Sequence, residues 1–369
     1  MKIAIVKLSA IGDVVHALPL ARLLRRRHPT AQITWIIERH AAHIIKGLTD
    51  IDETLVIDTR EPRRLARAKL WFEGMRSVDA TRSQLTNVMP HWSIDAQGLI
   101  KSGLVSWAMG APLRTGFPAA MCRERGNALF TNDRPPVRPG LHVIESMLEL
   151  LGPEWTPPPP EDLALPLFPG EGDAVRNWTQ DARRGHQFLV ALNPSASWVT
   201  KRWPLHRFEE LLTAFSSRAD VRFVVLWGPG ERETAEILVN HHPARALLAP
   251  DLSLRELYGL LSNCDLYVGG DTGPMHLAAA AGTAAVGIFG PTDPARNGPY
   301  GANTISLWRR RQCSPCHKRA CDHGEDCLDS LPAAPVIAAV SRMLAAIGQG
   351  AQCSERIDVT HGSPDSVRC

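Results

Sequence analysis

Hydrophobic and polar positions in the first part of the chain predict alternating strands and helices. Residues 2–6 (KIAIV) form a short apolar run rich in β-branched side chains, which is typical of a strand buried on both faces. From residue 13 the apolar positions recur every three to four residues, as on one face of a helix, and we expect Pro19 to kink that helix. Further strands are predicted at 32–37 and 54–57. The alternation predicts a parallel sheet with helices on both faces.

The pattern stops in a proline-rich stretch and resumes beyond it. Residues 153–172 hold seven prolines and little periodicity, so a semi-rigid linker is predicted at 156–172. Beyond it we predict strands at 188–192, 221–227, 266–268 and 285–289, and helices at 205–215, 231–239, 254–261, 274–281 and 334–347.

The sequence therefore predicts two α/β domains. They are a Rossmann-like domain at 1–155 and a second one at 173–332, followed by a helix at 333–347 and a polar, disordered tail at 348–369. Two parallel sheets that face a central crevice place the carboxyl ends of their strands at that crevice, where ligands bind in this architecture.

Composition and charge limit the possible cellular location of the protein and the kinds of partner it can bind. The chain of 369 residues is 44% hydrophobic, and no apolar stretch reaches the roughly 20 residues of a membrane span. We therefore expect a cytoplasmic protein. Residues 1–160 carry 21 basic and 15 acidic residues (+6), whereas 161–369 carry 20 and 23 (−3). Two basic runs in the first half suit either an anionic partner or a solvated helix face: Arg22, Arg25, Arg26 and Arg27, then Arg60, Arg63, Arg64, Arg67 and Lys69.

Two motifs that follow predicted strands carry candidate chemistry. In the first, Gly12 permits a tight turn and Asp13 stands at a helix start, as a helix cap or as a general base. In the second, residues 269–276 (GGDTGPMH) place glycines around Asp271 and Thr272 before a helix, whose free amides suit a diphosphate. We interpret the density of glycine here as a sign of close ligand approach.

Two further loops add donors and a carboxylate. Residues 193–204 combine hydroxyl groups with Lys201 and Arg202, which suits the other side of a diphosphate. In residues 228–231 (GPGE) the glutamate is suited to the two hydroxyls of a ribose. Neither loop has the spacing of a phosphate-binding P-loop or of a dinucleotide-binding fingerprint, which argues against an NTPase or a dehydrogenase.

Five segments together resemble the ADP-heptose:lipopolysaccharide heptosyltransferases of glycosyltransferase family 9. The first two resemble the heptosyltransferase I branch more than the heptosyltransferase II branch. The resemblance implies an inverting, metal-independent glycosyltransferase of GT-B fold that needs no cofactor beyond ADP-heptose, its donor substrate. It also suggests that the helix at 333–347 crosses back to the first domain. The segments are KLSAIGDVVHALPL (7–20), IDAQGLIKS (94–102), TKRWPLHRF (200–208), GGDTGPMHLAAAAG (269–282) and IFGPTDPARNGPYG (288–301).

The same resemblance assigns roles to individual residues. Asp13 matches the catalytic base, and Lys201 the phosphate-binding lysine. Glu231 matches the ribose-binding glutamate, although Glu233 is an alternative. The other donor-binding positions are Ser197, Leu252, Asp271, Thr272, Gly273 and His276, and the expected acceptor-binding positions in the first domain are Ser9, Gly12, Gln97 and Lys101.

These roles describe one reaction. Asp13 takes the proton of an acceptor hydroxyl in the Kdo region of the lipopolysaccharide inner core, while Lys201 and the helix amides stabilise the departing ADP. The resemblance implies a peripheral protein on the cytoplasmic face of the inner membrane, with no nucleic-acid partner. The alternatives are a heptosyltransferase II-like acceptor, a transferase or epimerase that uses a UDP-sugar, and a non-enzymatic nucleotide-sugar binder.

Four cysteines cluster late in the chain. Cys313, Cys316, Cys321 and Cys327 have a spacing that is compatible with a structural zinc site, although it is not that of a standard zinc ribbon. We expect no metal in the catalytic site.

Overall fold

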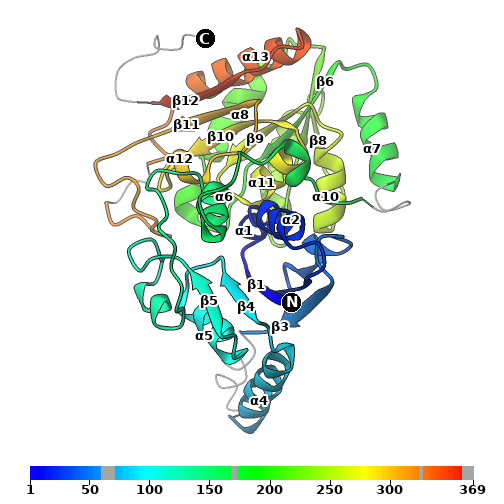
Figure 1. Ribbon diagram of the computed structural model, residues 1–369. Coiled ribbons are helices and arrows are strands. Elements are labelled where there is room, and N and C mark those ends of the chain that lie inside the picture. The colour runs from blue at the N-terminus through cyan, green and yellow to red at the C-terminus, as the bar shows by residue number, and fades with distance from the viewer. Residues whose placement is uncertain (60–70, 168–172, 324–326, 360–369) are drawn as a thin grey trace. The chain divides into compact units, whose positions relative to one another are not determined.

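The chain divides into two compact units, Met1–Pro166 and Leu167–Cys369 (Figure 1). The computed structural model describes residues 1–59, 71–167, 173–323 and 327–359. The basic run from Arg60 to Lys69, the end of the expected linker and the last ten residues lie outside the described residues.

The first unit is built on a parallel sheet of five strands in the order β3-β2-β1-β4-β5. The central strand β1 is buried from Ile3 onward, as its apolar sequence predicts. The strands are β1 (Lys2–Val6), β2 (Gln32–Glu38), β3 (Glu53–Ile57), β4 (Trp92–Asp95) and β5 (Leu113–Gly116). The helices are α1 (Ile11–Val15), α2 (Leu18–Arg27), η1 (Ala42–Ile45), α4 (Trp71–Val88), α5 (Ile100–Ala108), η2 (Arg125–Leu129), α6 (Val143–Leu148), η3 (Glu149–Leu151) and η4 (Pro160–Asp162).

The helix that was expected to kink at Pro19 is two helices. α1 ends at Val15, and α2 begins at Leu18 with Pro19 in its first turn. A proline is tolerated there because the first amides of a helix have no carbonyl partner within the helix. Pro19 therefore helps to begin a helix instead of bending one.

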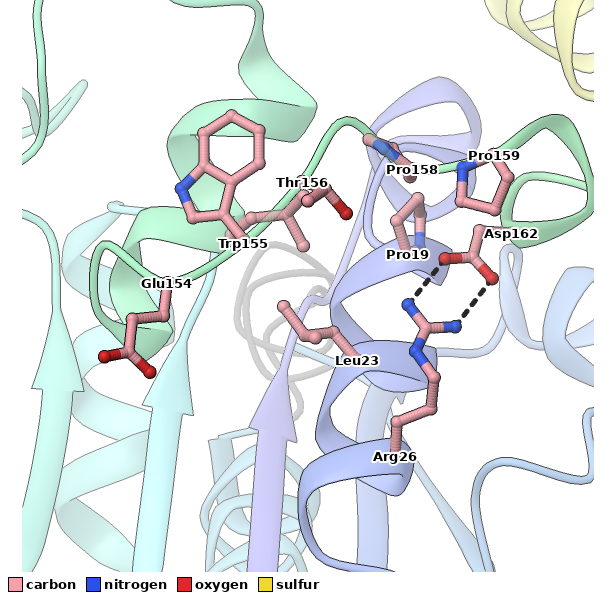
Figure 2. Close-up of a pocket in the computed structure, with 10 residues that line it drawn as sticks. Pro19, Leu23, Arg26, Glu154, Trp155, Thr156, Pro158, Pro159 and Asp162 are labelled. Atoms are coloured by element: carbon pink, nitrogen blue, oxygen red, sulfur yellow. Dashed lines mark hydrogen bonds and ion pairs between the residues drawn. The ribbon is translucent and has the colours of Figure 1, made fainter.

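The segment expected to begin the linker is part of the first unit. Arg26 binds the buried Asp162 through two bonds, Nη1 to Oδ1 at 2.8 Å and Nη2 to Oδ2 at 2.7 Å (Figure 2). Arg22 Nη2 donates to the carbonyl of Ala164 at 2.7 Å. These bonds attach residues 152–166, which we call the strap, to α2. The linker prediction at 156–172 is thus wrong up to Pro166, because arginines four residues apart on one helix hold the strap.

The remaining arginines of the first basic run also bind groups of the protein. Arg25 Nη2 lies 2.6 Å from Asp52 Oδ2, and Arg27 Nη1 donates to the carbonyl of Leu151 at 2.5 Å. These contacts favour neither of the two interpretations given above, an anionic partner or a plain solvated face. The four arginines of this run instead clamp neighbouring segments of the first unit to α2.

A cavity of about 370 Å³ lies between α2 and the strap. Pro19 and Leu23 of α2 line one side, and Trp155 and Pro158 of the strap line another (Figure 2). None of the predicted site residues lines this cavity.

The second unit is built on a parallel sheet of seven strands in the order β12-β11-β10-β9-β6-β7-β8. Its strands are β6 (Phe188–Asn193), β7 (Val221–Val225), β8 (Ala246–Leu248), β9 (Leu266–Gly270), β10 (Ala284–Phe289), β11 (Thr304–Trp308) and β12 (Ser354–Asp358). Its helices are α7 (Asp173–Arg183), η5 (Val199–Lys201), α8 (Leu205–Ala214), α9 (Arg232–His241), α10 (Leu254–Leu261), α11 (Gly273–Ala280), α12 (Pro294–Asn297) and α13 (Ala333–Gly348).

The late helix α13 packs on the second sheet. Val336, Val340 and Met343 are fully buried in the core of this unit, where the helix contacts α8 and strands β9 to β11. Its crossing back to the first domain stays a prediction. None of the described helices combines the length and the hydrophobicity that a membrane crossing requires.

The polar tail contains a strand that the sequence analysis missed. Residues 354–358 form β12, which extends the sheet by pairing in parallel with β11. The expectation of disorder is wrong for this segment, because Ile357 and Val359 alternate with polar residues and are buried in the core. The edge of an existing sheet supplies the hydrogen bonds that so short a polar strand needs.

Candidate active site

The end of β9, just before the turn to α11, is packed so tightly that only glycine fits at its last two positions. A Cβ atom on Gly270 would lie 2.7 Å from the carbonyl oxygen of Lys201, and one on Gly269 would lie 2.6 Å from the hydroxyl oxygen of Tyr267. Protein atoms therefore occupy the space beside both glycines. The interpretation of these two glycines as a sign of close ligand approach is wrong, because they let the turn approach the protein itself.

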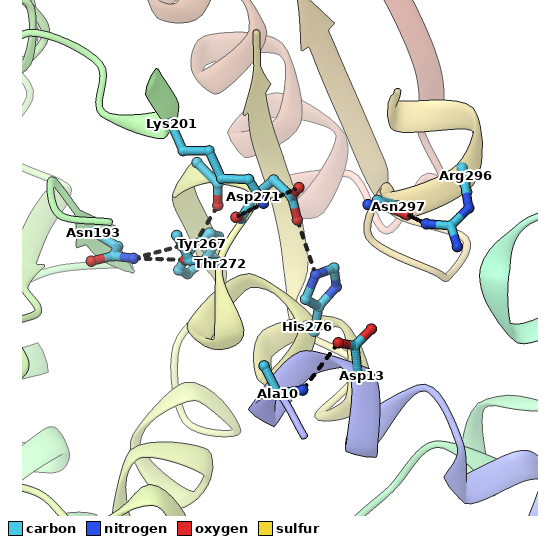
Figure 3. Close-up of polar contacts among 11 residues, drawn as sticks. Ala10, Asp13, Asn193, Lys201, Tyr267, Asp271, Thr272, His276, Arg296 and Asn297 are labelled. Atoms are coloured by element: carbon cyan, nitrogen blue, oxygen red, sulfur yellow. Dashed lines mark hydrogen bonds and ion pairs between the residues drawn. The ribbon is translucent and has the colours of Figure 1, made fainter. Parts of the chain in front are cut away.

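Asp271 lies on this turn with both carboxylate oxygens bound to basic side chains. Lys201 Nζ donates to Asp271 Oδ2 at 2.6 Å and to its carbonyl at 3.1 Å, and His276 Nε2 lies 3.2 Å from Oδ1 (Figure 3). Burial alone raises the pKa of the Asp271 carboxyl, but the hydrogen bond from His276 and the charge of Lys201 outweigh it. The resulting pKa is well below the usual range, so Asp271 is a buried anion.

A second network holds the same turn and was missed by the sequence analysis. Asn193 Nδ2, at the end of β6, donates to the Tyr267 hydroxyl at 3.1 Å and to Thr272 Oγ1 at 3.0 Å (Figure 3). Burial raises the pKa of Tyr267 to about 12, and the nearby charge of Asp271 adds to this shift. The phenol therefore stays neutral and remains a hydrogen-bond donor.

The N-terminus of α11 is presented by this network. Thr272 is the residue before the first helical turn, and its hydroxyl makes no capping bond to α11. Gly273 and Pro274 follow it, and His276 lies one turn into the helix. Amides at a helix N-terminus favour anions, and here Lys201 adds a cation beside them.

An aromatic side chain, Trp198, lies beside Lys201. Its Nζ lies 4.7 Å from the centre of the Trp198 ring, and the Arg319 guanidinium lies 5.4 Å from the same ring. Ser197, the expected phosphate contact, is exposed at the end of the loop after β6. Trp198 thus has two cations against its ring, Lys201 and Arg319, and the sequence analysis predicted neither Trp198 nor Arg319 as part of the site.

The expected ribose and adenine positions lie on neighbouring helix starts. Glu231 precedes α9 and turns back, because its Oε2 accepts from the Gly228 amide at 3.1 Å. Glu233 lies in the first turn of α9 and is exposed. Leu252 is half-buried directly before Ser253, which caps α10. These positions do not decide between the two glutamates as ribose ligands.

In the first unit, Asp13 lies in the first turn of α1. Its Oδ2 accepts from the amide of Ala10 at 3.0 Å, which closes the loop after β1 (Figure 3). Asp13 is half-buried, and Gly12 beside it is buried. One carboxylate oxygen thus fixes the loop while the side chain keeps some contact with solvent, which suits either a cap or a general base.

Gln97 ties this loop to the end of β4. Its Oε1 accepts from the Leu8 amide at 2.8 Å, and its Nε2 donates to the Ser9 carbonyl at 2.8 Å. The buried Lys7 donates its Nζ to the Ala96 carbonyl at 2.8 Å. The expected acceptor-binding residues Ser9 and Gln97 therefore lie together. The side-chain amide of Gln97 holds the backbone of Leu8 through its oxygen and the backbone of Ser9 through its nitrogen.

Asp95 organises the start of α5. It is fully buried and accepts from Ser102 Oγ at 2.9 Å, from Asn127 Nδ2 at 2.5 Å and from the backbone amides of Gln97 and Gly98. Burial raises the pKa of Asp95 despite these bonds. Four donors around one carboxylate fix the loop before α5, the helix that carries Lys101.

Lys101 pairs with an acid of its own unit. Its Nζ lies 2.6 Å from Oε1 of Glu38, whose side chain is 3% exposed, while the Lys101 side chain itself is 35% exposed. His40 Nδ1 lies 3.6 Å from the other oxygen of the same carboxylate. Any acidic acceptor group must therefore share Lys101 with Glu38.

The four clustered cysteines lie around one cavity. Cys313, Cys316, Cys321 and Cys327 line a cavity of about 240 Å³. Within the described residues of the chain, no three His, Cys, Asp or Glu side chains come together as metal ligands. A structural zinc site in this segment stays a prediction from the cysteine spacing.

Comparison with known proteins places the chain in a family. Residues 80–325 match the family model described as glycosyltransferase family 9 (heptosyltransferase). The chain is 32% identical to lipopolysaccharide heptosyltransferase 1 of Pseudomonas aeruginosa over 88% of this chain and 88% of the relative. The chain belongs to glycosyltransferase family 9. The corresponding protein of Escherichia coli K12 is 28% identical over 83% of this glycosyltransferase and 92% of its own length.

A solved structure supports the fold of this glycosyltransferase. The E. coli heptosyltransferase WaaC with ADP superposes with a TM-score of 0.70 at 23% identity, covering 93% of this chain and 100% of that one. The likeness confirms the predicted GT-B fold class with two Rossmann-like parallel sheets.

The residues missed in this glycosyltransferase had a weak signal in the sequence. Asn193 was noticed only as the first residue of a hydroxyl-rich loop, and Tyr267 only as part of a strand. A polar side chain at the last position of a buried parallel strand and a tyrosine inside another are the available clues, since both need partners when buried.

Proposed function

We propose that this glycosyltransferase moves L-glycero-D-manno-heptose from ADP-heptose to the Kdo region of the lipopolysaccharide inner core. The observation that carries the proposal is the Asp271–Lys201–His276 group beside the uncapped N-terminus of α11, a site for a diphosphate. The choice of heptose rests on the similarity to lipopolysaccharide heptosyltransferase 1 over most of both chains.

In this proposal the second unit binds the donor. Lys201, Ser197 and the first amides of α11 meet the diphosphate, Glu231 meets the ribose, and Leu252 contacts adenine through its backbone. Asp271 acts as a positioning residue, because both of its carboxylate oxygens are already bound to Lys201 and His276. Its negative charge next to a diphosphate is offset by these two partners.

The first unit supplies the base. Asp13 removes the proton of an acceptor hydroxyl, whose oxygen forms the new bond to the anomeric carbon as the bond from that carbon to the diphosphate breaks. ADP leaves with the bonding electron pair, and attack opposite the leaving group inverts the configuration. Lys201 and the α11 amides stabilise the charge that grows on ADP, so we propose that the transfer is metal-independent.

The acceptor is carried by a lipid, so we propose that the enzyme acts at the cytoplasmic face of the inner membrane. Gln97 and Lys101 are the proposed acceptor contacts, with Lys101 shared between Glu38 and the acidic sugar.

The test is an ADP-release assay with purified full-length protein, ADP-heptose and Kdo-terminated lipid A. ADP release that depends on this acceptor is the expected result. Activity only on an acceptor that already carries one heptose would assign the heptosyltransferase II-like reaction. Release from a UDP-sugar, or donor binding without turnover on any acceptor, would overturn the proposal.

A further inference from the structure

The first unit exposes a stripe of large apolar side chains along α5. Ile100, Leu104 and Trp107 are spaced four and three residues apart and so share one face of the helix, where they are 42%, 43% and 58% exposed. Val105 and Met109, on another face, are buried in the core. Several large apolar side chains gathered on one exposed face mark a surface that meets a nonpolar partner.

The short helix η2 extends this stripe. η2 packs beside α5, and a Cβ atom on Gly126 would lie only 3.1 Å from Ile100 Cδ1. Leu129, the last residue of η2, is 85% exposed, and Met121 in the preceding loop is also exposed. We call Ile100, Leu104, Trp107, Met121 and Leu129 the α5 surface.

Positive charge accompanies the α5 surface. Residues 96–132 hold four basic residues (Lys101, Arg114, Arg123 and Arg125) and one acidic residue, Glu124. Glu124 Oε2 accepts from the Ile100 amide at 2.7 Å, at the start of α5. Arg123 and Arg125, on either side of it, are exposed. The segment therefore has a net charge of +3 (4 − 1), complementary to anionic phosphate groups.

We propose that the α5 surface docks the enzyme onto an anionic lipid bilayer. Leu104 and Trp107 enter the boundary between headgroups and acyl chains, where an amphipathic tryptophan ring is favoured. Arg123 and Arg125 lie against lipid phosphates. The inference deepens the proposed function, which requires a lipid-borne acceptor. Lys101, the proposed contact for the acidic acceptor sugar, lies on the first turn of the same helix.

Vesicle co-sedimentation of the full-length protein tests this docking. We expect the protein to pellet with phosphatidylcholine–phosphatidylglycerol vesicles, and much less with phosphatidylcholine alone or at high salt. The double variant Leu104→Ser, Trp107→Ser should bind about tenfold more weakly, because it loses the apolar groups that enter the bilayer. Arg123→Ser with Arg125→Ser should weaken binding and reduce its salt dependence. As a matched control, Ile237→Ser on α9, also exposed, should leave binding unchanged.

Circular dichroism and thermal unfolding confirm that each variant is folded. Equal vesicle binding by the wild type and the Leu104–Trp107 double variant, or binding that needs no anionic lipid, would overturn the docking. So would a double variant that changes only from dimer to monomer in light scattering, because the surface would then join two copies of this chain.

A separate readout distinguishes this inference from the proposed function. Heptose transfer to a soluble, deacylated acceptor should be unchanged in the double variant, since this reaction needs the active site but no membrane. A wild type that binds anionic vesicles and transfers heptose to no acceptor would support the docking and overturn the proposed function.

Discussion

Lys201 Nζ lies 2.6 Å from Asp271 Oδ2, with the Lys201 side chain 16% exposed and that of Asp271 5% exposed. A lysine side chain that is buried to this extent needs a counter-ion, and Asp271 provides it. Asp271 in turn holds the ammonium group of Lys201 beside the N-terminus of α11. The pair thus fixes the position of a cation before any diphosphate binds.

Lys201→Ala should weaken donor binding and slow turnover together. The ammonium meets the diphosphate in the ground state and more strongly as charge develops on ADP, so a loss of about 10²–10³-fold in kcat/KM is expected. Lys201→Arg keeps the charge and should recover only part of this loss, because the geometry around Asp271 is set for lysine. Steady-state kinetics and ADP titration measure both effects, and unchanged kinetics for Lys201→Ala would remove this residue from the site.

Asp13→Asn should abolish most of the transfer and leave ADP affinity nearly intact. The amide oxygen of asparagine can still accept from the Ala10 amide, so the loop is retained while the base is lost. General-base catalysis typically contributes about 10²–10⁴-fold to the rate. Transfer rates and calorimetric ADP binding check the two halves of the expectation, and near wild-type turnover would assign the base elsewhere.

Asp271→Asn should lower the free energy of unfolding by about 3–5 kcal/mol, because it leaves two basic side chains without their buried partner. The matched control is Asp220→Asn, whose carboxylate pairs with Arg218 at 2.6 Å in a more exposed place. That change should cost about 0–1 kcal/mol. Urea unfolding of both variants provides the measurement, and equal losses would contradict the proposed role of burial.

The Asp271 pair also predicts a pH dependence. The pKa of the Asp271 carboxyl is lower in the folded than in the unfolded chain. The contribution of this carboxylate to stability is therefore fully present above the unfolded pKa of about 3.9, and it is lost as the pH falls through the folded pKa. The stability difference between wild type and Asp271→Asn should therefore shrink as pH falls below about 4. A difference that grows in acid would have the wrong sign for a depressed carboxyl pKa.

Asp162→Asn should loosen the strap. The change removes the charge that accepts two bonds from Arg26, whose side chain is 53% exposed, and we expect a loss of about 1–2 kcal/mol. Glu210→Gln, which removes the charge from the partly exposed pair with Arg207, is the control and should cost less than about 1 kcal/mol. Urea unfolding measures the loss of stability, and limited proteolysis measures how readily the strap, residues 152–166, is cleaved. A strap as resistant to protease in the variant as in the wild type would argue against the clamp.

Short apolar runs and helical periodicity predicted β1, β2, β3, β6, β7, β9 and β10, whereas β4, β5, β8, β11 and β12 were not predicted. The helix at 254–261 and the strand at 2–6 have the bounds that the sequence analysis gave them. β12 was missed because a short polar strand becomes stable only on the edge of β11, a partner that lies far away in the sequence. The strap was misread for a similar reason, since its prolines gave no sign of the arginines on α2.

The candidate site was only partly visible in the sequence. Asp271, Lys201 and His276 could be selected because they stand in strand-end motifs, and the structure brings these three together. Their partners Asn193 and Tyr267 could not be selected, because a hydrogen bond between two strands depends on the order of the sheet, which places β6 beside β9. The sequence analysis correctly singled out Gly269 and Gly270, but the atoms that crowd these two residues belong to the protein and not to a ligand.

The hydrogen bonds described around Asp271 join β6, η5, β9 and α11 of the second unit, whereas those around Asp95 join β4, α5 and η2 of the first. Each of these two hydrogen-bond networks lies within one unit, and in the proposed function the second unit binds the donor and the first binds the acceptor. Natural selection can then diversify the sugar acceptor by changing the first unit without disturbing the second. A chimaera that joins this second unit to the first unit of a relative with another acceptor should inherit the donor of one parent and the acceptor of the other.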